Sequence, residues 1–112
     1  MAQFMLLLRG GEFPAQSPEE MQKVVEQYVA WADKLRQEGR HHGGDELKEG
    51  GRVLSVQNGK FVVDGPYVET KEIVGGYYLF EAKNIDEATE ISKGCPHLSF
   101  SGSIEIREVI PH

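Results

Sequence analysis

The side chains best suited to chemistry gather in the middle of the chain, around an Asp-Gly-Pro turn. Asp64 precedes the turn, and Glu69, Lys71 and Glu72 follow it within the next eight residues. The glycine permits unusual backbone angles and the proline lacks an N–H, so a strand cannot continue through them. Loops held by a rigid scaffold often carry binding and catalysis. This stretch therefore predicts a functional site.

Asp64 is the candidate catalytic residue. A carboxyl group at the end of a strand, facing an interior lined by tyrosine and phenylalanine, would be partly desolvated. Desolvation raises its proton affinity and suits it to be a general base. The structural alternative is that Asp64 caps its own turn through an Asx-type hydrogen bond. The sequence leaves both roles open, and one residue can fill both.

Lys71 is a candidate for holding an anionic group of a substrate, with the neighbouring acidic residues completing a polar rim. The alternating charges of Glu69, Lys71 and Glu72 also suit ion pairs that fix the loop or a dimer. We prefer this structural interpretation for Glu72. For Lys71 the two interpretations are balanced.

Three further residues are candidates for contacting a substrate. Tyr67 and Tyr78 carry hydroxyl groups close to the acidic cluster. Because successive side chains of a strand point to opposite faces, one of Tyr77 and Tyr78 must enter the core while the other can line a pocket. Arg107 could bind a carboxylate through two parallel hydrogen bonds. Its alternative role is a surface salt bridge with a neighbouring glutamate, which we prefer slightly.

His41 and His42 look like a metal-binding pair, but adjacent residues in an extended segment point in opposite directions. No cysteine or further histidine has ligand spacing, so we expect neither a metal nor another cofactor. Either His41 or His42 is instead a candidate general acid or base across a pocket from Asp64, and we select His41 as the substrate-binding candidate. Cys95 is the only cysteine, which excludes an internal disulfide and suits a reducing compartment.

Composition indicates one soluble domain spanning residues 1–112, with 39% hydrophobic residues. The formal charge of −6 argues against a nucleic-acid-binding protein, because binding phosphates needs a basic face. The apolar run over residues 4–8 is far shorter than the ~20 residues of a membrane span, and it lacks the features of a secretory signal. We therefore expect a cytoplasmic protein that does not contact membranes.

Hydrophobic periodicity and turn signals predict alternating strands and helices. The expected elements are a central strand at 4–8, a helix at 17–38, a hairpin formed by 52–57 and 60–63 around Asn58-Gly59, a strand at 76–82, a short helix from Asn84, and a strand at 103–109. We expect residues 40–51 to form a loop, with at most a short extended piece at 45–48. This order predicts an α+β protein with a ferredoxin-like βαββαβ sandwich.

Both helices of such a fold cover the same face of the antiparallel sheet. Apolar side chains of the strands at 4–8 and 76–82 must also project from the other face. The chain has too few helices to cover that face as well. A second copy of the sheet is the expected cover, which predicts a homodimer.

Residues 64–72, followed by Gly75-Gly76-Tyr77-Tyr78, resemble the signature of the YCII-related, or DGPF-domain, family. The resemblance extends to the strand at 4–8, to Trp31, to Ile85-Asp86-Glu87-Ala88, to Cys95-Pro96 and to the strand at 104–107. It implies a dimeric α/β barrel built from ferredoxin-like subunits. The family has no settled activity, and some members are encoded near, or fused to, sigma factors.

The chain departs from the family pattern at specific positions. Tyr67 stands where the family has phenylalanine, and Glu108 follows Arg107 where the family usually has proline. Better-studied members use a histidine on the first helix together with an aspartate, and this first helix has no histidine. Asp64 matches the acidic position of the motif, but its partner is left open.

Two functions follow from these observations. The first is a cofactor-free enzyme that does acid–base chemistry on a small, possibly anionic organic molecule, in the pocket of a dimeric α/β barrel. The second is a non-catalytic module that binds a small ligand or another protein and is linked to transcriptional regulation. Replacing Asp64 with Asn separates them, because only the first function would be lost.

Overall fold

The computed structural model describes residues 1–13, 17–64 and 73–112. In chain order the elements are β1 (Ala2–Gly10), α1 (Pro18–Gln37), β2 (His41–Glu46), β3 (Val53–Gln57), β4 (Lys60–Asp64), β5 (Val74–Ala82), α2 (Ile85–Ser92), the 3-10 helix η2 (Pro96–Phe100) and β6 (Gly102–Glu108). The chain is thus a mixed α+β protein, as the sequence predicts.

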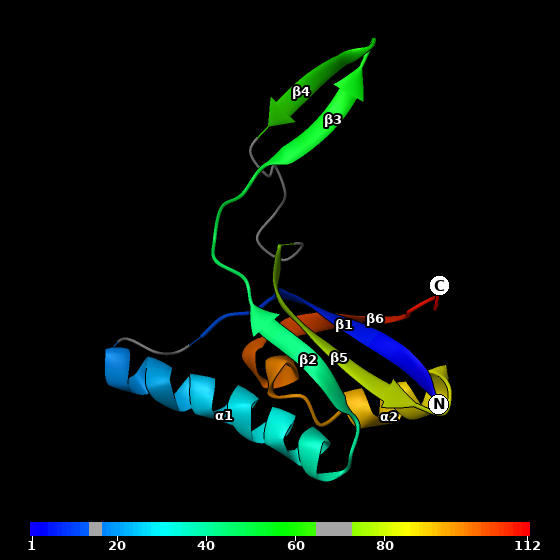
Figure 1. Cartoon of the computed structure of the whole chain (residues 1–112). Coiled ribbons are helices and arrows are strands. Elements are labelled where there is room, and N and C mark those ends of the chain that lie inside the picture. The colour runs from blue at the N-terminus through cyan, green and yellow to red at the C-terminus, as the bar shows by residue number, and fades with distance from the viewer. Residues whose placement is uncertain (14–16, 65–72) are drawn as a thin grey trace.

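Four strands form the main sheet, in the order β2-β5-β1-β6, and all neighbours are antiparallel. Helices α1 and α2 lie on the same side of this sheet (Figure 1). Without β3 and β4 the element order is βαββαβ, and the sheet order is that of a ferredoxin-like fold. No helix of the described residues lies on the opposite side of the sheet, and we call this side the open face.

The helices begin and end where the sequence predicts. The Ser17 hydroxyl accepts a hydrogen bond from the Glu20 backbone N–H at 3.1 Å, and the Asn84 side chain accepts one from Glu87 N–H at 2.9 Å. These bonds satisfy N–H groups that the first turn of a helix leaves without partners. After α1, Gly39 takes a positive φ of 74°, as expected for a residue that ends a helix.

The core lies between the main sheet and the two helices. The side chains of Phe4, Leu6 and Phe80 are completely buried there, and Leu35 of α1 is 1% exposed. Burial along β1 and β5 alternates between buried and half-buried residues. The apolar run at 4–8 therefore lies in a central strand, as predicted, but the chain itself covers only one of its two faces.

The edge strand β2 corrects the sequence analysis, which assigned residues 40–51 to a loop. Its sequence, His-His-Gly-Gly-Asp-Glu, contains no β-branched or large apolar residue, so periodicity gives no signal for a strand. The structure supplies a reason for one glycine. A Cβ on Gly44 would lie 2.7 Å from the backbone oxygen of Tyr77, so only glycine lets β2 approach β5 this closely.

The predicted hairpin is present, but it lies outside the main sheet. Strands β3 and β4 form a separate two-stranded sheet that projects from the body of the molecule (Figure 1). Asn58 and Gly59 have φ values of 52° and 77°, and positive φ at both positions is required for the expected type I′ turn. We call β3, β4 and their turn the arm.

Candidate functional site

An apolar strip crosses the middle of the open face. Met5 and Leu7 alternate along β1 with residues of the core, and Leu79 does the same along β5. In the sheet register Met5 lies opposite Leu79, so these side chains are neighbours. All three are half-buried although the chain places no helix over them. We call Met5, Leu7 and Leu79 the apolar strip.

Two hydrogen-bonded pairs of ionisable groups lie where β2 meets β5. The Tyr77 hydroxyl donates to Asp45 Oδ2 at 3.2 Å, and His42 Nε2 lies 3.1 Å from Glu81 Oε2. Tyr77 and Glu81 alternate along β5 with core residues, so both pairs belong to the open face. The hydrogen bond to Asp45, followed by the charge of that carboxylate, raises the pKa of Tyr77.

Three charged residues form a group on the other side of the apolar strip, on β1 and β6. Glu105 accepts hydrogen bonds from Arg107 Nη1 at 3.1 Å and from Arg9 Nη2. In the register, Glu105 is opposite Leu7 and Arg107 is opposite Met5, so the group shares the face of the strip. The bond from Arg107, then the bond from Arg9, lowers the pKa of Glu105. Its carboxylate therefore stays ionised and holds both guanidinium groups over this part of the sheet.

The open face thus combines three kinds of chemistry. The imidazole of His42, hydrogen-bonded to a carboxylate, offers a ring nitrogen that can take part in proton transfer. Tyr77 offers a hydroxyl donor. Arg107 has a side chain that is 70% exposed and can reach an anionic group while it contacts Glu105. The apolar strip between these groups can bind the carbon skeleton of a small molecule.

The structure distributes the predicted site residues over different places. Arg107 lies on the open face, together with the glutamate partner that the salt-bridge interpretation requires. His41 lies opposite Phe80 in the register, on the helix side, and burial, then the charge of Arg36, lowers its pKa. The two adjacent histidines therefore point in opposite directions, as expected, and the His42 side chain is the one that lies on the open face.

Tyr78 also lies on the helix side, away from the open face. Its side chain is 7% exposed, its hydroxyl donates to the backbone oxygen of Tyr28 at 3.1 Å, and its ring packs edge-on against Trp31 with centroids 4.9 Å apart. Burial raises the pKa of its hydroxyl. Of the two neighbouring tyrosines, Tyr77 therefore is the one that faces the open side.

Asp64 is exposed at the end of β4, at the base of the arm. It lies opposite Val53 in the arm's own register and belongs to a different sheet from the groups of the open face. Tyr67 and Lys71, with Glu69 and Glu72, lie outside the described residues. Asp64 and the groups of the open face thus lie on different sheets, and the roles of Asp64, Tyr67 and Lys71 remain predictions.

The sequence analysis missed Arg9, Asp45 and Glu81 as site residues, and it selected His41 instead of His42. Alternation along β5 contains the signal for Glu81, because it lies two and four residues from Leu79 and Tyr77 on the same face. The positions of His42 and Asp45 depend on β2, which the sequence did not reveal. The site could therefore not be assembled before the strand order was known.

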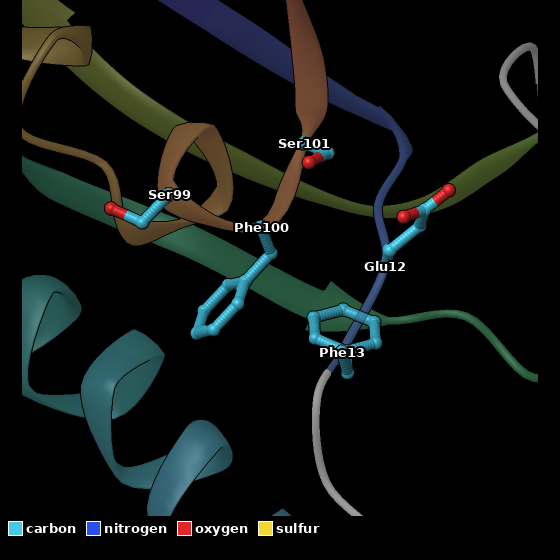
Figure 2. Close-up of a pocket in the computed structure, with 5 residues that line it drawn as sticks. All are labelled: Glu12, Phe13, Ser99, Phe100 and Ser101. Carbon is cyan, nitrogen blue, oxygen red and sulfur yellow. The ribbon is translucent and has the colours of Figure 1, made fainter.

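A hollow of about 390 Å³ lies elsewhere, beside η2 (Figure 2). It is lined by Glu12, Phe13, Ser99, Phe100 and Ser101. The ring of Phe100 stacks on Tyr28 of α1 at 6.1 Å, which places the hollow on the helix side of the sheet. Its lining has no pair of acid and base groups, so we assign the site to the open face.

His97 is a buried structural residue. Its side chain is 3% exposed, with Nε2 lying 2.8 Å from the Arg9 backbone oxygen and Nδ1 lying 3.0 Å from the Tyr28 hydroxyl. Since a carbonyl oxygen can only accept, Nε2 carries a hydrogen and donates it to Arg9, while Nδ1 is hydrogen-bonded to Tyr28. His97 therefore ties η2 to β1 and α1.

Within residues 1–13, 17–64 and 73–112, no three or more His, Cys, Asp and Glu side chains come together as a metal site. In the same part of the chain, neither helix has the length and apolar character needed to cross a membrane.

Comparison with known proteins identifies the family. The family model for the YCII-related domain matches residues 3–112. The chain therefore belongs to the YCII-related family.

The relatives add little about activity. An uncharacterised protein of Rhizobium meliloti (strain 1021) is 40% identical over 47 residues, which are 41% of this chain and 38% of that protein. The match thus spans well under half of that relative. Among solved structures, 5-chloro-2-hydroxyhydroquinone dehydrochlorinase from Burkholderia phenoliruptrix AC1100, in complex with 2,5-dihydroxybenzoquinone, is similar with a TM-score of 0.44 and 16% identity, covering 98% of this chain and 95% of that chain.

Proposed function

We propose that the open face binds a small anionic organic molecule and catalyses proton transfer on it with the side chains of this protein alone. The observation that carries the proposal is the arrangement around the apolar strip. Proton-exchanging pairs lie on its β2 side, and the arginine-containing group lies on its β6 side. A carboxylate at Arg107 would place an apolar skeleton over Met5 and Leu79, with its far end near His42.

In this arrangement His42 is the base that takes a proton from a carbon next to a carbonyl group. Glu81 orients the imidazole and stabilises its protonated form. The Tyr77 hydroxyl hydrogen-bonds to the carbonyl oxygen as negative charge develops there. Returning the proton to a different atom completes an isomerisation, in which one C–H bond breaks and one new bond to hydrogen forms.

Asp64 stays in the proposal as a second candidate base, supplied from the arm. Tyr67 and Lys71, which follow it in the sequence, would then contribute a hydroxyl and a positive charge to the same ligand. Comparing Asp64→Asn with His42→Gln decides which group takes the proton, because the two lie on different sheets.

The proposed site needs a cover, and we propose that a second copy supplies it. The apolar strip is half-buried on a face without a helix, and two such faces packed together would enclose a pocket between the sheets. This is the dimeric α/β barrel that the family resemblance implies.

Binding is tested with benzoate, which combines a carboxylate with an apolar ring. Calorimetric titration of Arg107→Gln should show binding weakened by about 10-fold or more, since hydrogen bonds to charged groups contribute about 1.5–3 kcal/mol. Lys93→Gln is the matched control, because it removes one positive charge from the end of α2, where Lys93 pairs with Glu90. Equal binding to both variants would contradict the proposal.

Catalysis is tested with 4-acetylbenzoate, which carries its ketone at the end of the ring opposite the carboxylate and exchanges the hydrogens of its methyl group by proton transfer. The proposal predicts that the wild-type protein accelerates this reaction and that His42→Gln or Asp64→Asn slows it about 100-fold or more, with benzoate binding retained. Benzoate binding without any acceleration by the wild-type protein would favour the alternative function, a non-catalytic ligand-binding module.

A further inference from the structure

The arm has one face made entirely of apolar side chains. Leu54 lies opposite Val63, and Val56 lies opposite Phe61. Because these residues alternate with the rest of their strands, all four project from the same side of the ribbon. The exposed fraction is 64% for Leu54, 62% for Val56, 79% for Phe61 and 57% for Val63. We call Leu54, Val56, Phe61 and Val63 the arm's apolar face.

The opposite face of the same ribbon has a different character. Ser55, Gln57, Lys60 and Asp64 project there, together with Val53 and the half-buried Val62. One mostly polar face and one entirely apolar face is the pattern of a sheet that packs against something. A two-stranded hairpin alone in water is at best marginally stable, so an arm built in this way needs a partner surface.

The described part of the chain does not supply that surface. The arm is a separate sheet, and its strands pair only with each other within residues 17–64 and 73–112. Figure 1 shows it standing clear of the main sheet and of both helices. Within the described residues the apolar face therefore does not pack against the molecule's own core.

The area available matches what a stable dimer needs. The chain exposes 8152 Å², whereas a compact monomer of 12.5 kDa exposes about 6,200 Å², an excess of about 2,000 Å² per copy. The radius of gyration is 16.0 Å, against about 13 Å for a compact domain of this length. Permanent homodimers bury about 2,000 Å² or more in total, so the excess of two copies suffices.

The position of the arm favours a second copy of this chain as the occupant. The arm stands on the side of the main sheet opposite to α1 and α2, which is the side of the open face (Figure 1). A second copy that faces the sheet therefore comes within reach of the arm, and twofold symmetry gives each copy the same contact. The apolar face holds no charge, so the net charge of −6 on each chain does not oppose this contact locally.

We propose that the apolar face of the arm is buried against a second copy of this chain, so that two arms clasp the dimer. The proposal shares the dimer with the proposed function, but it rests on other residues and needs neither ligand binding nor catalysis.

Thiol labelling tests this directly, because the native thiol is hidden. Cys95 is 2% exposed, and burial raises its pKa to about 11, so it reacts slowly. Val56→Cys places a thiol on the apolar face, and Gln57→Cys places one on the opposite face of the same strand. We expect maleimide to label Val56→Cys at least about 10-fold more slowly at protein concentrations above the dimer dissociation constant than below it. Gln57→Cys should react equally at both concentrations.

A second pair of variants tests the energy of the contact. Leu54→Ser combined with Phe61→Ser should raise the dimer dissociation constant, measured by sedimentation equilibrium, by about 100-fold or more, because two large apolar anchors are removed. Gln57→Ser combined with Lys60→Ser is the control on the other face and should leave it unchanged. Circular dichroism checks that the main sheet and helices remain folded in both.

The outcomes separate the inference from the proposed function. A dimer that persists with the Val56→Cys thiol reactive at every concentration overturns the clasp and leaves the sheet-to-sheet dimer standing. Protection that does not depend on concentration overturns it too, because the arm would then be covered within one chain. A wild-type protein that stays monomeric at high concentration overturns the clasp and the proposed cover of the pocket together, whereas benzoate binding is still measured separately.

Discussion

Gly102 is the position where the packing around His97 leaves no space. A Cβ there would lie 2.2 Å from His97 Nε2, and that ring is fixed at both nitrogens by Arg9 and Tyr28. Gly102→Ala must therefore displace η2 or break a buried hydrogen bond. We expect it to lower the free energy of unfolding by about 1–3 kcal/mol, measured by urea denaturation.

Gly75→Ala is the control for this prediction. It also lies near the start of a strand of the main sheet, but among the described residues nothing lies within 4 Å of the position of its Cβ. We expect a change within about 0.5 kcal/mol. Equal effects of the two substitutions would show that loss of glycine flexibility, rather than the contact with His97, sets the cost.

Individual residue roles were predictable where one strand or helix decides them. The helix caps Ser17 and Asn84 and the opposite directions of the two adjacent histidines follow from local geometry alone. The choice between Tyr77 and Tyr78 does not, because both suit a strand and only the position of the helices decides which faces the core. The buried role of His97 depends on contacts 69 and 88 residues away in the sequence, which no local pattern contains.

At the scale of elements, α1 depends on its first turn. Ser17→Ala removes the acceptor for the Glu20 N–H, and we expect a loss of about 1 kcal/mol in the free energy of unfolding. Ser17→Asp retains an acceptor and adds a negative charge that the helix N-terminus favours, so it should keep most of the stability. A loss as large for Ser17→Asp as for Ser17→Ala would contradict the capping role.

The packing of α1 and η2 on the sheet predicts a loss of stability at high pH. Burial raises the pKa of Cys95 from 9.0 to about 11, and it raises that of Tyr28 from 10.0 to about 12. Both groups lose their protons at a lower pH in the unfolded chain than in the folded protein. Their contribution to the free energy of unfolding is therefore complete below pH 9.0, and it is lost as the pH rises towards the folded-state pKa values. Urea denaturation at increasing pH measures this decline.

Cys95→Ala separates the two contributions. Without the thiol, the decline should begin near the ordinary tyrosine pKa of 10.0 instead of 9.0. A protein whose stability is constant from pH 9.0 to about 11 would show that these groups ionise equally easily in the folded state.

Five of the six strands and both α-helices were expected from the sequence, because apolar periodicity and turn residues mark them. The exception, β2, is held in place by backbone bonds to β5 and by a glycine that permits close approach. Because β2 is not expected from the sequence, the predicted βαββαβ order includes the hairpin in the main sheet. In the structure, β2 forms the edge of that sheet and the hairpin projects as the arm.

At the scale of the whole molecule, two surfaces do not pack against another element of the described chain: the open face and the apolar face of the arm. The molecule measures 49 × 43 × 18 Å, which is thin for its other dimensions. A second copy placed against the open face would cover the half-buried apolar strip. We therefore expect the apolar strip to be part of an interface.

Leu79→Glu tests this expectation by placing a charge in the centre of the strip. We expect the dimer to dissociate, with a dissociation constant raised by about 100-fold or more in sedimentation experiments, because burying an unpaired carboxylate is costly. Ile85→Glu is the matched control, since Ile85 is 45% exposed at the start of α2 on the helix side. Dissociation by Ile85→Glu alone would place the interface on the helices instead.

The most direct test of the proposed site is a titration of ¹⁵N-labelled protein with benzoate, followed by NMR. We predict that the amide signals that shift most belong to the open face, around Leu7, Leu79 and Arg107, and that they lose this response in Arg107→Gln. Shifts that instead gather around Phe13 and Phe100, which line the hollow beside η2, would contradict the assignment of the site to the open face.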